Sequence, residues 1–229
     1  MKSSLKSAAA VCLFTLAAFT VFTSCFPDTP ANPSVIRIGV RLNDIDSTFT
    51  SNNDSLTVNR VRLIHGFSFF KLTGDSTLTF PLPSQLSYPN SRGTYVNLIL
   101  NSPFPERVYE GLTFKIVRAK SIPDSVQRFN PDAAFTDGGN YSVIVSGTFN
   151  SNKFTLKVPK AFSYDFNFTP AVTVGSGSKL YQFLISANME SWFSNDDGNG
   201  FLNPTVAEND SAIYNNISQS FTIEQLSPE

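Results

Sequence analysis

Apolar and polar residues alternate along much of the chain from residue 35 onward. Strict alternation is typical of a β-strand that buries one of its faces. In VIRIGVRL, residues 35–42, every even-numbered residue is Ile, Val or Leu and points toward one side. The same period recurs at residues 112–117, 141–158 and 162–168. The pattern therefore predicts a mainly antiparallel β-protein, with its clearest hairpin at 141–158.

Other stretches modify this picture. TYVNLIL (94–100) and LYQFLISA (180–187) are apolar on both faces, which predicts two interior strands. In the strands expected between 56 and 72, alternation places the odd-numbered residues from Val61 to Phe69 on one face. Residues 119–140 are long for a loop of a compact domain, so we expect a short helix within them.

The chain ends with a helical period. Ile213, Ile217 and Phe221 are four residues apart, which is the spacing of one helix face. Asn203-Pro204 suits a helix start, because Asn caps helices and Pro is favoured at the first helical position. Antiparallel strands followed by one or two short helices near the C-terminus predict an all-β fold, for which a β-sandwich is the natural closure.

The N-terminus carries a targeting signal. Lys2 and Lys6 precede an apolar run at residues 8–22, which is shorter than the ~20 residues of a membrane-spanning helix. The run leads into Thr23-Ser24-Cys25, which resembles the lipobox of bacterial lipoproteins. The resemblance implies cleavage before Cys25 and attachment of a diacylglycerol to its sulfur. A general secretory signal that is cut nearby is the alternative.

Cysteine usage favours lipidation of Cys25. Cys12 is the only other cysteine and would leave with a signal peptide of residues 1–24. Cys25 would then lack a disulfide partner, and an unpaired exported cysteine needs an explanation. Residues 25–34 are rich in proline and predict an extended tether. The β-sandwich domain would follow at 35–229, with a break near 101–110 where it could subdivide.

Composition and net charge limit the classes of binding partner that we expect. The chain has 22 Phe residues, which suits strands, and a formal net charge of −1. Loss of Lys2 and Lys6 with the signal peptide would make the mature protein more acidic, so no nucleic-acid partner is expected. Phe26 stands where some bacteria place an inner-membrane retention aspartate, which favours the outer membrane, on its periplasmic or its cell-surface face. The lipid anchor would contact the membrane, while a protein or glycan partner stays unspecified.

Four segments carry a further resemblance: YEGLTFKIVRAK (109–120), the hairpin at 141–158, WFSNDDGNGFLNP (192–204) and IYNNISQSF (213–221). Together they resemble a group of uncharacterised lipoproteins of Bacteroidota-like bacteria. The resemblance covers the C-terminal half well and the first half loosely. It implies a β-sandwich domain of unknown function on a lipid anchor, and it brings no catalytic residues.

An inventory of chemical groups favours a non-enzymatic protein. His65 is the only histidine, so a Ser-His-Asp triad would need it, yet it lies in phase with core residues. No Gly-x-Ser-x-Gly elbow occurs, and zinc ligands are missing. We therefore predict a lipid-anchored envelope protein with a binding, adhesion or structural role. An extracytoplasmic hydrolase that uses loop carboxylates is the alternative.

The segment WFSNDDGNGFLNP also suits a calcium loop in part. Asn195, Asp197, Asn199 and Asn203 fall at ligand positions of an EF-hand-like pattern. Val206 stands where the bidentate glutamate would be, and turn chemistry alone explains the composition. Calcium is therefore the minor interpretation, and no other cofactor is expected.

The same segment is expected to act chiefly as a structural corner. Trp192 and Phe193 would plug the core, Gly200 would permit the turn, and Pro204 would start the helix.

A modification motif also recurs. Asp-Ser followed by an apolar residue or Thr resembles the O-glycosylation acceptor of Bacteroidota-like bacteria. The acceptor serines would be Ser47, Ser55, Ser76, Ser125 and Ser211. We expect them to lie in loops.

Overall fold

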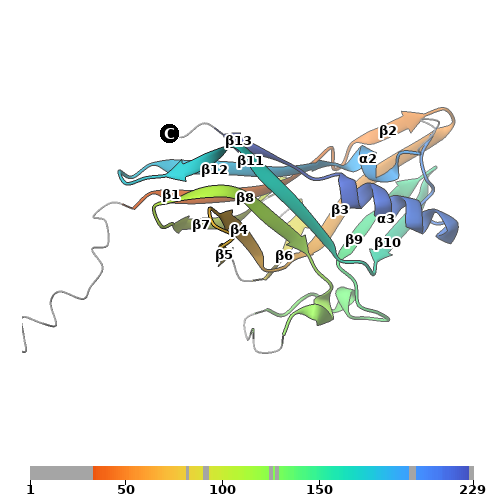
Figure 1. Cartoon of the computed structure of the whole chain (residues 1–229). Coiled ribbons are helices and arrows are strands. Elements are labelled where there is room, and N and C mark those ends of the chain that lie inside the picture. Colours follow the sequence, from red (N-terminus) through yellow and green to blue (C-terminus); the bar gives the residue numbers. More distant parts are fainter. Residues whose placement is uncertain are drawn as a thin grey trace, which may run out of the picture.

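Two β-sheets form a sandwich-like fold, as the sequence predicted (Figure 1). The computed structural model describes residues 33–80, 83–89, 93–123, 126, 129–195 and 200–226. The predicted signal peptide, Cys25 and most of the tether lie outside these residues. None of the helices in the described ranges is long and apolar enough to cross a membrane.

The smaller sheet has the strand order β13-β12-β1-β7. Its strands are β1 (Val35–Asn43), β7 (Val96–Pro103), β12 (Leu180–Asn188) and β13 (Thr222–Leu226). β1 pairs antiparallel with β7 and parallel with β12. β12 is an interior strand, as predicted, but the prediction for β7 is wrong, because β7 lies at the sheet edge and leaves Leu98 53% exposed.

The larger sheet has the strand order β10-β9-β3-β8-β4-β5. In addition, β2 and β6 pair with β3, and β11 pairs with β8. The predicted hairpin at 141–158 is confirmed as β9 paired with β10. The strands are β2 (Thr48–Ser51), β3 (Asp54–His65), β4 (Ser68–Leu72), β5 (Thr77–Phe80), β6 (Ser84–Tyr88), β8 (Arg107–Ile116), β9 (Val143–Phe149), β10 (Asn152–Val158) and β11 (Phe162–Val174).

Two irregularities reset which residues face the core. A register shift between Val58 and Arg60 turns both Val58 and Val61 inward and leaves Arg60 exposed. β3 then ends at His65, and β4 starts at Ser68 with the opposite phase. The prediction of one continuous face from Val61 to Phe69 is therefore wrong beyond His65, and Phe67 is 37% exposed.

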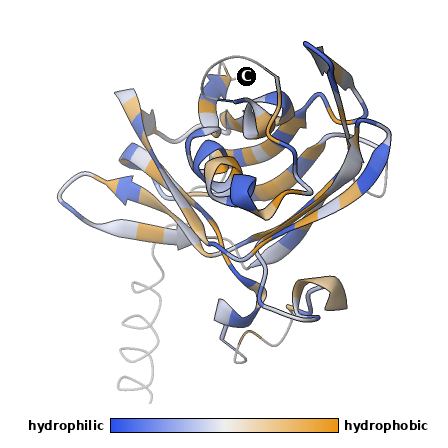
Figure 2. Cartoon of the chain, turned by 90° about the vertical axis from the view of Figure 1, so that its right-hand side faces the viewer, coloured by the Kyte–Doolittle hydropathy of each residue, from blue (hydrophilic) through white to orange (hydrophobic). Residues whose placement is uncertain are grey.

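Short helices close the open end of the sandwich. α2 (Met189–Phe193), the 3-10 turn η3 (Ala207–Asn209) and α3 (Asp210–Gln219) follow β12. Figure 2 shows α3 lying inside the concave side of the curved sheets. Ile213 and Ile217 are fully buried there and Phe221 nearly so, which confirms the predicted apolar face.

The predicted start of this helix at Asn203-Pro204 is wrong. Asn203 Oδ1 accepts hydrogen bonds from the backbone N–H and the hydroxyl of Thr205, at 2.9 and 2.8 Å. This local turn competes with helix formation, and Pro204 is buried in it. α3 begins at Asp210, after η3.

The described residues between 119 and 140 form a lobe on the outer face of the larger sheet (Figure 2). In its described part the lobe contains two short 3-10 helices, η1 (Ala119–Ser121) and η2 (Ala133–Phe135), where one short helix was expected. Its Ala119 and Phe135 pack with the outward-facing Ile64 and Ile144 into a small second core. The lobe therefore covers the outward apolar residues of β3 and β9.

Candidate functional site

A buried serine–histidine pair lies between the two sheets. His65 Nε2 is 2.9 Å from Ser68 Oγ, which also accepts the backbone N–H of Lys115 at 3.3 Å. The His65 ring stacks on Phe114 with centroids 5.4 Å apart. His65 and Ser68 are both 0% exposed. The pair contains a base and a hydroxyl nucleophile in contact, but substrate has no path to it.

Burial also fixes the protonation state of His65. Desolvation lowers the pKa of His65 to about 4, so the ring is neutral at neutral pH. Within the described residues its Nδ1 atom has no hydrogen-bond partner. The prediction of a core histidine is confirmed, and the Ser68 contact, which the sequence did not suggest, arises because the β3–β4 break turns both side chains inward.

Two carboxylates on the outer face have unusual environments. The backbone N–H of Ala134, followed by the charge of Arg62, lowers the pKa of Asp132. The hydroxyl of Thr113, followed by Lys71, lowers the pKa of Asp165. Both groups are therefore ionised at neutral pH. A glycosidase general acid needs the opposite shift, a raised pKa.

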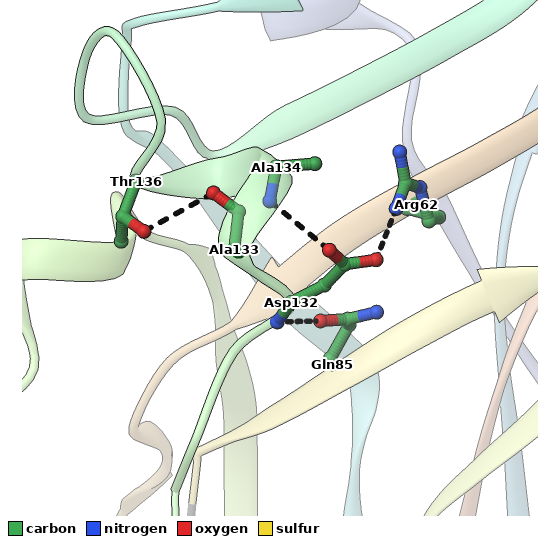
Figure 3. Close-up of polar contacts among 6 residues, drawn as sticks. All are labelled: Arg62, Gln85, Asp132, Ala133, Ala134 and Thr136. Carbon is green, nitrogen blue, oxygen red and sulfur yellow. Dashed lines mark hydrogen bonds and ion pairs between the residues drawn. The ribbon is translucent and has the colours of Figure 1, made fainter.

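Asp132 is the anchor that holds the lobe to the sheet (Figure 3). Its carboxylate accepts the N–H of Ala134 at 3.0 Å and forms an ion pair with Arg62 of β3. Its backbone N–H donates to Gln85 Oε1 of β6 at 2.9 Å. The Arg62 guanidinium also lies 5.8 Å from the ring centroid of Phe135. One residue thus caps η2 and fixes it to two strands.

A pocket of about 390 Å³ opens in this lobe. Its volume falls in the range of small-molecule sites, which begins at about 300 Å³. Six of the nine lining residues are apolar, and Lys120, Asn130 and Thr136 are the polar ones. The lining residues are Ala119, Lys120, Ile122, Pro123, Val126, Phe129, Asn130, Pro131 and Thr136. This mixture would suit a small apolar molecule that carries one anionic group.

The segment that was predicted as a structural corner contributes to the main core. Trp192 and Phe193 are 0% exposed. Trp192 Nε1 donates to Ser220 Oγ at 2.7 Å, and the Phe193 ring packs 5.9 Å from that of Phe154. An isolated bridge between Ser194 and Phe201 then closes the corner.

The corner docks on the turn between β2 and β3. Gly200 has φ +80° and its N–H donates to Ser51 Oγ at 3.2 Å, while Phe201 N–H reaches Asp54 Oδ2 at 3.4 Å. A Cβ atom on Gly200 would lie 2.9 Å from the same Asp54 oxygen. The local sequence gives no sign of this contact, because Asp54 lies 147 residues from Phe201 along the chain.

The calcium residues are only partly described. Asp197 and Asn199 lie outside the described residues. The backbone N–H of Asn195 donates to the Gly200 carbonyl at 3.4 Å, and Asn203 uses its side-chain oxygen in the turn with Thr205. Across the described ranges, no three His, Cys, Asp or Glu residues gather where they could hold a metal ion.

The five serine acceptors occupy different settings. Ser47 and Ser76 lie exposed in turns, as predicted. Ser55 belongs to β3 and Ser211 to α3, so the expectation that all lie in loops is wrong for these two. Ser125 lies outside the described residues, and glycosylation of any of them stays a prediction.

Comparison with known proteins adds no family to this description. No protein-family model matches the chain, and neither the curated proteins nor the solved structures give a match. Its class is therefore stated from the fold alone: a mostly antiparallel, sandwich-like β-protein with a short C-terminal helix.

Proposed function

We propose that this chain is a lipid-anchored β-sandwich protein of the bacterial outer membrane that acts by binding a partner rather than by catalysis. The observation that carries the proposal is the Thr23-Ser24-Cys25 sequence and its position before the domain. β1 starts at Val35, so a tether of residues 25–34, spanning at most ~35 Å, would join the lipid directly to the sandwich.

The state of the polar groups supports a binding role. The Ser68–His65 pair is buried and neutral, so it is unsuited to attack a substrate. Asp132 and Asp165 have lowered pKa values and are engaged in ion pairs that hold the surface together. The lobe pocket, by contrast, offers an open recess of ligand size with Lys120 at its lining.

Cys25→Ala tests the anchor, with Cys12→Ala as the matched control. Both variants and the wild type are expressed in a host that processes lipoproteins and fed an alkyne-labelled fatty acid. We expect label and outer-membrane fractionation for the wild type and Cys12→Ala. Cys25→Ala should be unlabelled and leave the membrane fraction. Retention of a labelled Cys25→Ala protein would contradict the proposal.

A further inference from the structure

Beyond the lobe, the outward residues of β9 and β10 and of the adjoining part of β3 are polar. β3, β9 and β10 pair side by side there, and their outward residues combine cations with hydroxyl groups. We call this surface the basic face and define it by six residues: Arg60, Ser146, Thr148, Lys153, Thr155 and Lys157. The outward apolar residue of β9, Ile144, is 1% exposed because the lobe covers it.

Strand register arranges these groups in cross-strand rows. Arg60 lies opposite Ser146, which lies opposite Thr155. In the next row Thr148 lies opposite Lys153. Neighbouring strands are ~4.8 Å apart and alternate residues along a strand ~6.6 Å apart, so hydroxyls and cations are regularly spaced on this surface. The register shift at Val58/Arg60 places Arg60 on this surface.

The positive charge of this face is compensated only in part, since Arg60 lies near enough to Asp132 to help lower the pKa of that carboxyl. The ion pairs among the described residues are Arg62–Asp132 and Lys71–Asp165, so the three cations of the basic face have none there. Arg60 and Lys153 are exposed, and the Lys157 ammonium lies 5.1 Å over the ring centroid of Tyr141 at the rim. The whole chain has a net charge of −1, so the concentration of cations is local.

We propose that the basic face binds an acidic polysaccharide through carboxylate or sulfate groups. Such a polymer repeats anionic groups and hydroxyls along an extended chain, which matches rows that each combine a cation with Ser or Thr hydroxyls. The surface lies at the end formed by β2, β9 and β10, opposite the start of β1 (Figure 1). An anchor attached ahead of β1 would therefore leave it directed away from the membrane.

Other anionic partners fit the basic face less well. A membrane surface would be met from the end where β1 starts, and the basic face has no exposed apolar side chain to insert into lipid. Single-stranded nucleic acid would need exposed aromatic rings for base stacking. Tyr141 at the rim is already covered by Lys157.

The test compares two double variants of the full chain that change the net charge equally. Arg60→Gln/Lys153→Gln alters the basic face, while Arg107→Gln/Lys179→Gln alters exposed cations elsewhere. Affinities for polygalacturonate and for dextran sulfate are measured by biolayer interferometry at low salt, with neutral dextran as the uncharged control. We expect the first variant to bind one or both acidic polymers roughly tenfold more weakly, because it loses two exposed ion pairs between the protein and the polymer. The second variant should bind like the wild type.

The proposal would be overturned if the wild type bound neither acidic polymer, or if both double variants weakened that binding equally. It would also be overturned if the wild type bound oligo-dT or phosphatidylglycerol vesicles more tightly than the acidic polymers. Unfolding midpoints of both variants exclude a folding defect as the cause. The inference goes beyond the proposed anchored binding protein and does not need the lipid. Fractionation of Cys25→Ala and polysaccharide binding can therefore fail independently.

Discussion

The two faces of the larger sheet are made from alternate residues of the same strands, yet polar groups on them differ in burial and in charge. On the inner face, His65 and Ser68 are sealed among aromatic rings, and burial holds the histidine neutral. On the outer face, Arg62 and Asp132 stay charged and hold the lobe in place. The difference shows how burial keeps a titratable group neutral on one face, while partial exposure lets an ion pair form on the other.

The inner face should respond most strongly to truncation. Trp192→Ala removes a fully buried ring and its hydrogen bond to Ser220. We expect a loss of about 3–5 kcal/mol in the free energy of unfolding, measured by urea denaturation, because a large cavity is created. Val206→Ala, at a side chain 37% exposed, should change it by less than about 0.5 kcal/mol. Similar values for the two variants would contradict the contrast between core and surface.

Acid should destabilise the inner face through His65. Its folded pKa of about 4 lies below the ordinary histidine pKa of 6.5, so the unfolded chain binds a proton first as pH falls. Stability is therefore complete above pH 6.5 and is lost toward pH 4, by on the order of 3 kcal/mol. Unfolding free energies at steps across this range measure the loss.

His65→Phe provides the control for this titration. It keeps a ring against Phe114 and removes the ionisable group, so its stability should be nearly flat between pH 6.5 and 4. Asp132 and Asp165 have pKa values below 3.8 and therefore titrate beneath this window. An unchanged pH profile in His65→Phe would show that another group carries the effect.

Gly147 of β9 pairs with Val58 of β3, beside the register shift in that strand. A Cβ atom at this position would lie 2.0 Å from the Thr57 carbonyl oxygen, so Gly147→Ala must displace the β3–β9 pairing. We expect a loss of about 1–3 kcal/mol in denaturant unfolding. Gly175→Ala, where a Cβ atom has nothing within 4 Å, should leave stability within about 0.5 kcal/mol. Equal tolerance of both substitutions would argue against the tight pairing.

The smallest global effect is expected on the outer face. Arg62→Ala breaks the ion pair with Asp132, whose side chain is 42% exposed, so overall stability should fall by no more than about 1 kcal/mol. The effect should instead be local, with faster amide hydrogen exchange in residues 129–141. Lys71→Ala breaks the Lys71–Asp165 pair and should leave exchange in the lobe unchanged. Unaltered lobe exchange in Arg62→Ala would show that Arg62 does not hold it.

The period of apolar residues was a sufficient guide where structure is set locally. It predicted β1, the β9–β10 hairpin, the interior position of β12 and the apolar face of α3. It failed at β7, because an apolar strand can lie at an edge, and at the start of α3, because Asn203 forms a turn instead of a cap. The phase error beyond His65 arose from a strand break that alternation cannot reveal.

The candidate sites were less predictable, because their residues are distant in sequence. Arg62 and Asp132 are 70 residues apart, and Phe201 and Asp54 are 147 residues apart. No local pattern signals such contacts, which depend on how strands from both halves of the chain pair. The lobe was recognised only as a long segment, without its pocket.

The sequence by itself determined the β-rich class, the alternation of buried and exposed positions, and the composition of the corner at 192–204. These follow from the two-residue period of a strand and from turn chemistry, both of which act locally. Tertiary structure alone decided which strands became edges, where bulges reset the alternation, and which cations remained unpaired on the basic face. Those outcomes depend on strand register and on burial, because both are set by residues that meet only after the chain has folded.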